Sequence, residues 1–162
     1  MKKVGIVMGS DSDLPVVKKA CDTLKELGIP FELHVYSAHR TPEKAKEFAE
    51  NAAENGFGAI IAAAGMAAHL AGALAANTVL PVVGIPVRND TLDGLDALLS
   101  TVQMPSGIPV ATVGINAAAN AALLCAEILA VEDASLRQKL TEKRRASAEA
   151  VLEKDRTIMD RL

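Results

Sequence analysis

Short apolar runs alternate with segments of helical periodicity along most of this 162-residue chain. The runs are rich in Val, Ile and Ala, as expected of parallel strands that are covered on both faces. They lie at residues 3–8, 31–37, 59–64, 81–87 and 109–113, and helical segments follow them at 14–28, 41–55, 69–77, 93–100 and 116–131. This alternation predicts an α/β fold, a three-layer sandwich with helices on both faces of a five-stranded parallel sheet.

The simplest strand order for such a chain is the flavodoxin-like order 2-1-3-4-5. Residues 1–131 would then form a single α/β catalytic domain. Residues 132–162 carry eight Lys or Arg and seven Asp or Glu, and no strand follows them. We therefore expect a long C-terminal helix, a helical extension that either lies across its own domain or packs on a neighbouring subunit, with the neighbour favoured.

Charge is unevenly distributed along the chain. Residues 56–131 contain five charged side chains in 76 positions, whereas the other 86 positions contain 32. The same segment holds 19 alanines. A buried central sheet with Ala-rich helices accounts for part of this pattern, but so little polar surface would not cover a monomer. The sequence therefore predicts a homo-oligomer.

Composition also limits the class of partner and the compartment. The formal net charge is −3, and no cluster of Lys or Arg precedes the last helix, so neither nucleic acid nor a membrane is expected as a partner. Cys21 and Cys125 lie on apolar helix faces, where free thiols behave as small hydrophobes, and no metal site is expected. These features predict a soluble cytoplasmic protein that binds a small molecule.

The loop Gly9–Asp13 lies between the first strand and the first helix, where α/β proteins hold anionic ligands. Backbone N–H groups and the hydroxyls of Ser10 and Ser12 would donate to a phosphate, whereas Asp13 would accept hydrogen bonds from sugar hydroxyls. The combination favours a ribose phosphate. The alternative is that Ser and Asp only cap the helix.

Three further polar residues follow the ends of neighbouring strands. Arg40 supplies planar donors suited to phosphate, although an arginine at this place could equally form a surface ion pair. His69 lies in an Ala/Gly-rich loop, and an imidazole exchanges protons near neutral pH. A lone histidine is more often structural, but only Asp13 and His39 could replace His69 in proton transfer here. We therefore interpret His69 as the candidate acid and base.

The sequence resembles the N5-carboxyaminoimidazole ribonucleotide mutases of purine biosynthesis. The resemblance runs from about residue 3 to residue 130 without large insertions. The matching segments are Met8–Asp13, Ser37–Pro42, Ala67–Leu70, Leu80–Val87 and Leu98–Pro105.

The resemblance implies that the protein interconverts N5-carboxyaminoimidazole ribonucleotide and 4-carboxy-5-aminoimidazole ribonucleotide through trapped CO2, with no cofactor and no metal. His69 would be the general acid and base, and the protein would be an octamer. The implied contacts with the ribonucleotide substrate come from Ser10, Ser12, Asp13, Ser37, Ala38, His39 and Arg40. An apolar pocket that includes Gly65, Ala67, Ala68 and Leu70 would hold CO2 without hydrating it.

The chain departs from the commonest family pattern around His69, which is richer in glycine and has a proline after His-Leu. Here Ala63, Met66 and Ala71 occupy those places. Two other functions stay open at this point. One is the related class that carboxylates aminoimidazole ribonucleotide directly with CO2, which typically has Lys at the place of Arg40 and lacks the histidine. The other is a non-catalytic nucleotide-binding module.

Overall fold

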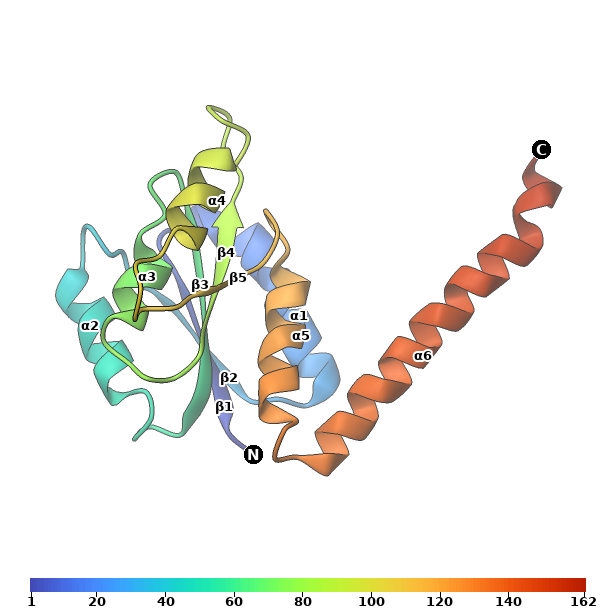
Figure 1. Ribbon diagram of the computed structural model, residues 1–162, viewed down its shortest axis with the longest axis horizontal. Coiled ribbons are helices and arrows are strands. Elements are labelled where there is room, and N and C mark those ends of the chain that lie inside the picture. Colours follow the sequence, from blue (N-terminus) through green and yellow to red (C-terminus); the bar gives the residue numbers. More distant parts are fainter.

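The computed structural model describes residues 1–162 and contains one five-stranded parallel sheet in the order β2-β1-β3-β4-β5 (Figure 1). The predicted strand order is therefore confirmed. The strands are β1 (Lys3–Met8), β2 (Phe31–Val35), β3 (Phe57–Gly65), β4 (Val82–Val87) and β5 (Ala111–Thr112). The helices are α1 (Leu14–Leu27), α2 (Pro42–Asn51), α3 (Leu70–Ala75), α4 (Leu95–Val102), α5 (Ala118–Leu129) and α6 (Ala134–Thr157), with short 3-10 turns η1 (Asp11–Asp13) and η2 (Ile158–Arg161).

Helices cover both faces of the sheet, with α1 and α5 on one side and α2 and α3 on the other (Figure 1). The alternation of side chains along β3 shows how one strand serves two cores. Ile61 packs with residues of α1 and α5, whereas its neighbour Ile60 packs with residues of α2 and α3. Both side chains are completely buried. Successive side chains of a strand point to opposite faces, so an uninterrupted apolar run is what a doubly covered strand needs.

Several elements are shorter than the sequence predicts. Helix α2 ends at Asn51 rather than near Asn55, and turns complete the connection to β3. The fifth strand was expected over 109–113, but only Ala111 and Thr112 pair with β4. Pro109 has no N–H to give to a sheet, so the apolar run there is longer than the strand.

Helix α6 begins on the domain and then leaves it (Figure 1). The Asp133 side chain caps its first turn by accepting from the Leu136 N–H at 2.9 Å. Leu136 and Leu140 are buried in the same core as α1 and α5, and Lys139 Nζ donates to the Leu27 carbonyl. Beyond Arg144, which pairs with Glu127, nearly every residue is exposed. The extension therefore has an anchored base and a projecting distal half.

None of the helices combines the length and apolar character that crossing a membrane requires. Both cysteines are free and buried, as predicted. Burial raises the pKa of the Cys125 thiol to about 12. These thiols therefore serve as core packing.

Candidate active site

A cleft of about 730 Å³ lies at the carboxyl ends of β1 to β4. This is the edge at which an open parallel sheet binds its ligand, and the volume is that of a typical small-molecule site. Four loops, one after each of these strands, supply its walls. The lining residues are Gly9, Ser10, Ser12, Asp13, Ser37, Ala38, His39, Arg40, Ala64, Gly65, Met66, Ala67, His69, Leu70, Val87, Arg88 and Asn89.

The loop after β1 forms the hydroxyl-rich wall. Ser10 caps the 3-10 turn η1, because its Oγ accepts from the Ser12 N–H at 3.3 Å. The Ser12 hydroxyl also donates to Ser10 Oγ at 2.9 Å. The capping role that the sequence allowed is therefore present. It coexists with exposure of both hydroxyls to the cleft, where they are placed to meet an anion.

Asp13 differs from its neighbours because only 8% of its surface is exposed. Burial raises the pKa of the Asp13 carboxyl, a hydrogen bond from the Ser10 backbone opposes this rise, and the charge of Asp11 adds to it. The Asp13 side chain caps no backbone N–H of α1. The carboxyl is thus held in the cleft at a cost in desolvation, an arrangement typical of a group kept for a ligand.

The loop after β2 is braced by its own side chains. Thr41 directly precedes α2, but its side chain does not cap the helix: the hydroxyl accepts from the Ser37 N–H at 2.9 Å and donates to the Ser37 carbonyl. The Ser37 hydroxyl in turn accepts from the Arg40 N–H at 3.1 Å. The guanidinium of Arg40 donates to the Gly9 carbonyl at 3.2 Å. Arg40 therefore lies beside the hydroxyl-rich wall, where the hypothesis of a phosphate contact requires a cation.

Two histidines from different loops meet in the cleft. His39 Nε2 and His69 Nδ1 are 2.9 Å apart, and the rings meet edge to face. One ring must donate and the other accept, because both nitrogens cannot carry a proton within one such bond. When the outer nitrogen of one ring gains a proton, the proton in the hydrogen bond can move to the other ring. The positive charge is then shared between the two histidines. The structure joins His39, predicted as a wall residue, to His69, predicted as the acid and base.

The end of β3, the loop after it and the start of α3 provide an apolar wall formed by Ala64, Gly65, Ala67 and Leu70. Met66 adopts a left-handed backbone conformation with φ of 54°. Such a φ favours glycine, which agrees with the glycine-rich pattern of the resembling family at this loop. The departure at Met66 thus places a strained, largely exposed side chain at the cleft.

Every substrate-binding residue predicted from the sequence lines the cleft except Ala68. Its side chain is 2% exposed and lies outside the lining residues. Arg88 and Asn89, from the loop after β4, line the cleft although the sequence analysis did not select them. The signal was available, since the predicted strand order puts the end of β4 beside that of β3.

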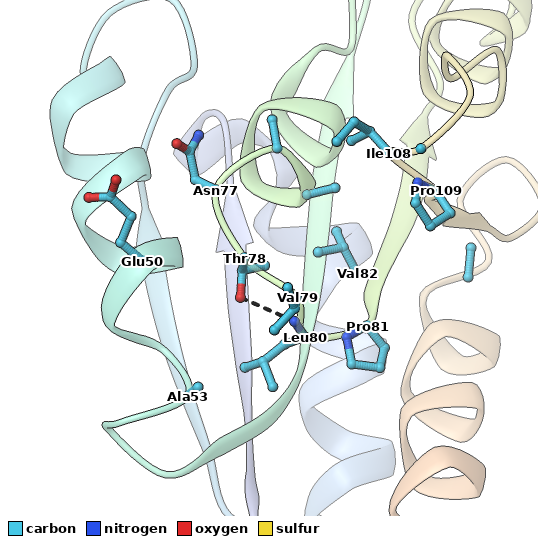
Figure 2. A pocket seen from close by; sticks show the side chains of 14 residues that line it. Glu50, Ala53, Asn77, Thr78, Val79, Leu80, Pro81, Val82, Ile108 and Pro109 are labelled. Carbon is cyan, nitrogen blue, oxygen red and sulfur yellow. Dashed lines mark hydrogen bonds between the residues drawn. The ribbon is translucent and has the colours of Figure 1, made fainter.

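A larger groove of about 1000 Å³ lies at the opposite edge, near the start of β4 (Figure 2). Its walls include Leu80, Ile108 and Val79, and the Val79 side chain is fully exposed. Glu50 is the one ionisable residue among its lining residues. This groove lacks a set of groups for proton transfer, so the smaller cleft is the better candidate active site.

Comparison with known proteins identifies the family of the chain. The family model described as AIR carboxylase matches residues 3–150. The chain belongs to the AIR carboxylase family. The N5-carboxyaminoimidazole ribonucleotide mutase of Pyrococcus abyssi is 56% identical over 144 residues, which are 89% of this chain and 83% of that protein.

Members of the AIR carboxylase family also occur within longer chains. The phosphoribosylaminoimidazole carboxylase of Saccharomyces cerevisiae is 52% identical over 151 residues, which are 93% of this chain but 26% of the yeast protein. The fold is shared with solved structures as well. The crystal structure of Treponema denticola PurE superposes with a TM-score of 0.85 at 29% identity, over 95% of this chain and 96% of that chain.

Proposed function

We propose that this protein interconverts N5-carboxyaminoimidazole ribonucleotide and 4-carboxy-5-aminoimidazole ribonucleotide in purine biosynthesis, the activity for which the Pyrococcus abyssi relative is named. It is thus an isomerase, a mutase that moves a carboxyl group within one molecule. The observation that carries this proposal is the hydrogen-bonded pair of His39 and His69 in a cleft with one polar and one apolar wall.

The polar wall suits the ribose phosphate. Ser10, Ser12 and Arg40 would hold the phosphate, because hydroxyl and guanidinium donors converge where the loop after β1 meets the loop after β2. Asp13 would accept hydrogen bonds from the ribose hydroxyls. Ser37 and Ala38 would complete this side of the site.

The histidine pair would donate one proton to the substrate and later remove one proton from the product-forming intermediate. Its imidazolium form gives a proton to N5 as the carbamate C–N bond breaks, the bond electrons stay on nitrogen, and CO2 leaves. The ring carbon C4 of aminoimidazole ribonucleotide then attacks CO2 to form a C–C bond. The neutral pair removes the C4 proton and returns to its starting state. His69 acts as the acid and base, and its bond to His39 shares the charge.

The apolar wall would keep CO2 in place between the two halves of this reaction. Gly65, Ala67 and Leu70 have no polar side chain that would hold a water molecule beside CO2. Ala68, which is 2% exposed and follows Ala67, would support this wall. Exclusion of water prevents CO2 from being lost as bicarbonate.

Two substitutions test the role of the pair. We expect His69→Asn and His39→Asn each to lower turnover by at least about 100-fold, the usual worth of a positioned acid or base. Binding of 4-carboxy-5-aminoimidazole ribonucleotide should change much less. His34→Asn is the matched control, because His34 contacts Tyr36 and Glu32 and does not line the cleft. If His69→Asn retained turnover while His39→Asn lost it, the proton would belong to His39 and the role proposed for His69 would be wrong.

The second candidate function is direct carboxylation of aminoimidazole ribonucleotide with CO2. The name of the yeast relative favours it, at 52% identity. Arg40 and His69 favour the mutase, since the resemblance implies that direct carboxylases have Lys in place of Arg40 and lack the histidine. Retention of the carboxyl carbon during turnover distinguishes the two.

We also propose that the protein is a homo-oligomer, an octamer as the resemblance implies, in the cytoplasm. Exposed apolar residues support association of copies. They include Leu95, Leu99 and Val102 along α4, Val151 and Leu152 along the distal half of α6, and Met159 in η2. Such stripes on a monomer are typical of subunit contacts, and the distal half of α6 would pack on a neighbour.

A further inference from the structure

Arg88 stands out among the residues of the cleft because it has no part in the mechanism above. The 17 lining residues include two permanent cations, Arg40 and Arg88, and one carboxylate, Asp13. Arg40 follows β2 and Arg88 follows β4. Since the sheet order is β2-β1-β3-β4, three strand spacings separate them, about 14 Å. The two cations therefore mark opposite ends of the cleft.

The backbone of Arg88 is held by hydrogen bonds, whereas its side chain is largely exposed. The Arg88 N–H donates to the Asn116 side chain at 2.9 Å, and the Asn116 N–H donates to the Pro86 carbonyl at 2.9 Å. The Arg88 side chain is 62% exposed and pairs with Asp93, which is 74% exposed. An ion pair in water contributes little free energy, so Arg88 can exchange Asp93 for another anion at small cost.

The ribonucleotide of the proposed function is anionic at both ends. Its phosphate is placed at Arg40, and its base end carries the carboxyl group, as a carbamate before the reaction and as a carboxylate after it. The lining residues next to Arg88 are Val87, which is apolar, and Asn89, whose side-chain amide donates to Asp96. A guanidinium binds a carboxylate with two parallel hydrogen bonds. Arg88 is the one permanent cation placed to do this at the base end.

We propose that Arg88 leaves Asp93 and pairs with the carboxyl group of the bound ribonucleotide. This inference rests on the proposed function. CO2 and aminoimidazole ribonucleotide present no carboxylate at the base end, so the pairing exists before and after the reaction but not between its halves. Arg88 is therefore a specificity-determining residue, which favours binding of the carboxylated ribonucleotides and does not assist bond breaking.

The test compares the binding of two ligands by calorimetry. We expect Arg88→Gln to bind 4-carboxy-5-aminoimidazole ribonucleotide about tenfold more weakly, near the lower end for a lost hydrogen bond to a charged group because Arg88 is exposed to water. Aminoimidazole ribonucleotide should bind within about twofold of the unsubstituted chain. Arg88→Lys should lie between the two, because an ammonium keeps the charge but loses the paired donors.

Asp93→Asn tests the exchange of partners. Asn tolerates the left-handed conformation of Asp93, whose φ is 58°, so the loop should keep its shape. We expect two- to threefold tighter binding of the carboxylated ligand, because Arg88 no longer has a competing carboxylate. Asp22→Asn is the control for net charge, since it removes the same charge and Asp22 pairs with Lys18 on α1 outside the cleft.

Two results would overturn the inference: equal loss of both ligands in Arg88→Gln, or no change for either. In both cases the unsubstituted chain would still interconvert the two carboxylated ribonucleotides. If the unsubstituted chain failed to interconvert them, the proposed function would be wrong instead. The binding measurements do not depend on turnover, so the two failures are distinguishable.

Discussion

Replacement of Leu136 tests how the helical extension is attached to the domain. Leu136 is completely buried in the core that α1 and α5 share, whereas Leu152, four turns further along α6, is 52% exposed. The same Leu→Ala change at both positions removes the same atoms from two different environments. The comparison therefore isolates burial from helix propensity.

Leu136→Ala should lower the free energy of unfolding by about 3 kcal/mol, near the low end for a buried leucine because the site lies at the edge of the core. With a urea m-value of about 2 kcal/mol/M, the midpoint should fall by about 1.5 M. Leu152→Ala should cost less than about 0.5 kcal/mol in the dissociated chain. Its effect should appear in subunit association, as a lower midpoint at the protein concentrations at which the unsubstituted chain is associated.

Urea unfolding followed by circular dichroism at several protein concentrations measures both effects. Similar shifts for both variants at every concentration would refute the division of α6 into an anchored base and a projecting half. A Leu152→Ala chain with unchanged association in sedimentation velocity would count against packing of the distal half on a neighbour.

Three other predictions concern single side chains. Because burial raises the pKa of Asp13, the folded state binds that proton more tightly than the unfolded state does, and stability is lost as the pH rises from the ordinary Asp range through the folded pKa. Asp13→Asn should therefore raise the free energy of unfolding at pH 7 by on the order of 1 kcal/mol and leave it unchanged at pH 3, while it weakens ribonucleotide binding. Urea midpoints of the variant and the unsubstituted chain measure this at both pH values. A difference between the two midpoints that is the same at pH 7 and pH 3 would contradict the reasoning. Cys125, with a pKa of about 12, should resist iodoacetamide at pH 8 until urea unfolds the chain, as peptide mass mapping would show. Met66→Gly should relieve a left-handed residue and leave the urea midpoint equal or higher, whereas a clear drop would mean that the Met66 side chain stabilises the loop.

The fold was predictable because each strand carries its own signal. The run from Ala59 to Ala64 is apolar at every position, which only a strand covered on both faces requires, and the structure buries its first five residues. The limits of elements were harder to predict. Apolar residues 109–113 resemble a strand, but their pairing depends on backbone direction after Pro109, which periodicity does not report.

Most of the cleft was predictable for a topological reason. Residues that follow parallel strands lie at one edge of the sheet, so the sequence alone placed Ser10, Arg40 and His69 together. Contacts between individual side chains could not be predicted in this way. The hydrogen bond between His39 and His69 depends on how two loops turn, as does the withdrawal of Ala68 from the cleft.

The central claim is that the carboxyl group moves within one molecule through CO2 held in the cleft. The most direct test follows the carboxyl carbon when purified protein converts N5-carboxyaminoimidazole ribonucleotide labelled in its carbamate, in excess unlabelled bicarbonate. We predict that the label is retained in 4-carboxy-5-aminoimidazole ribonucleotide. Product that forms with its label lost to solvent would contradict the mutase and indicate the direct carboxylase, and absence of product would contradict either enzyme.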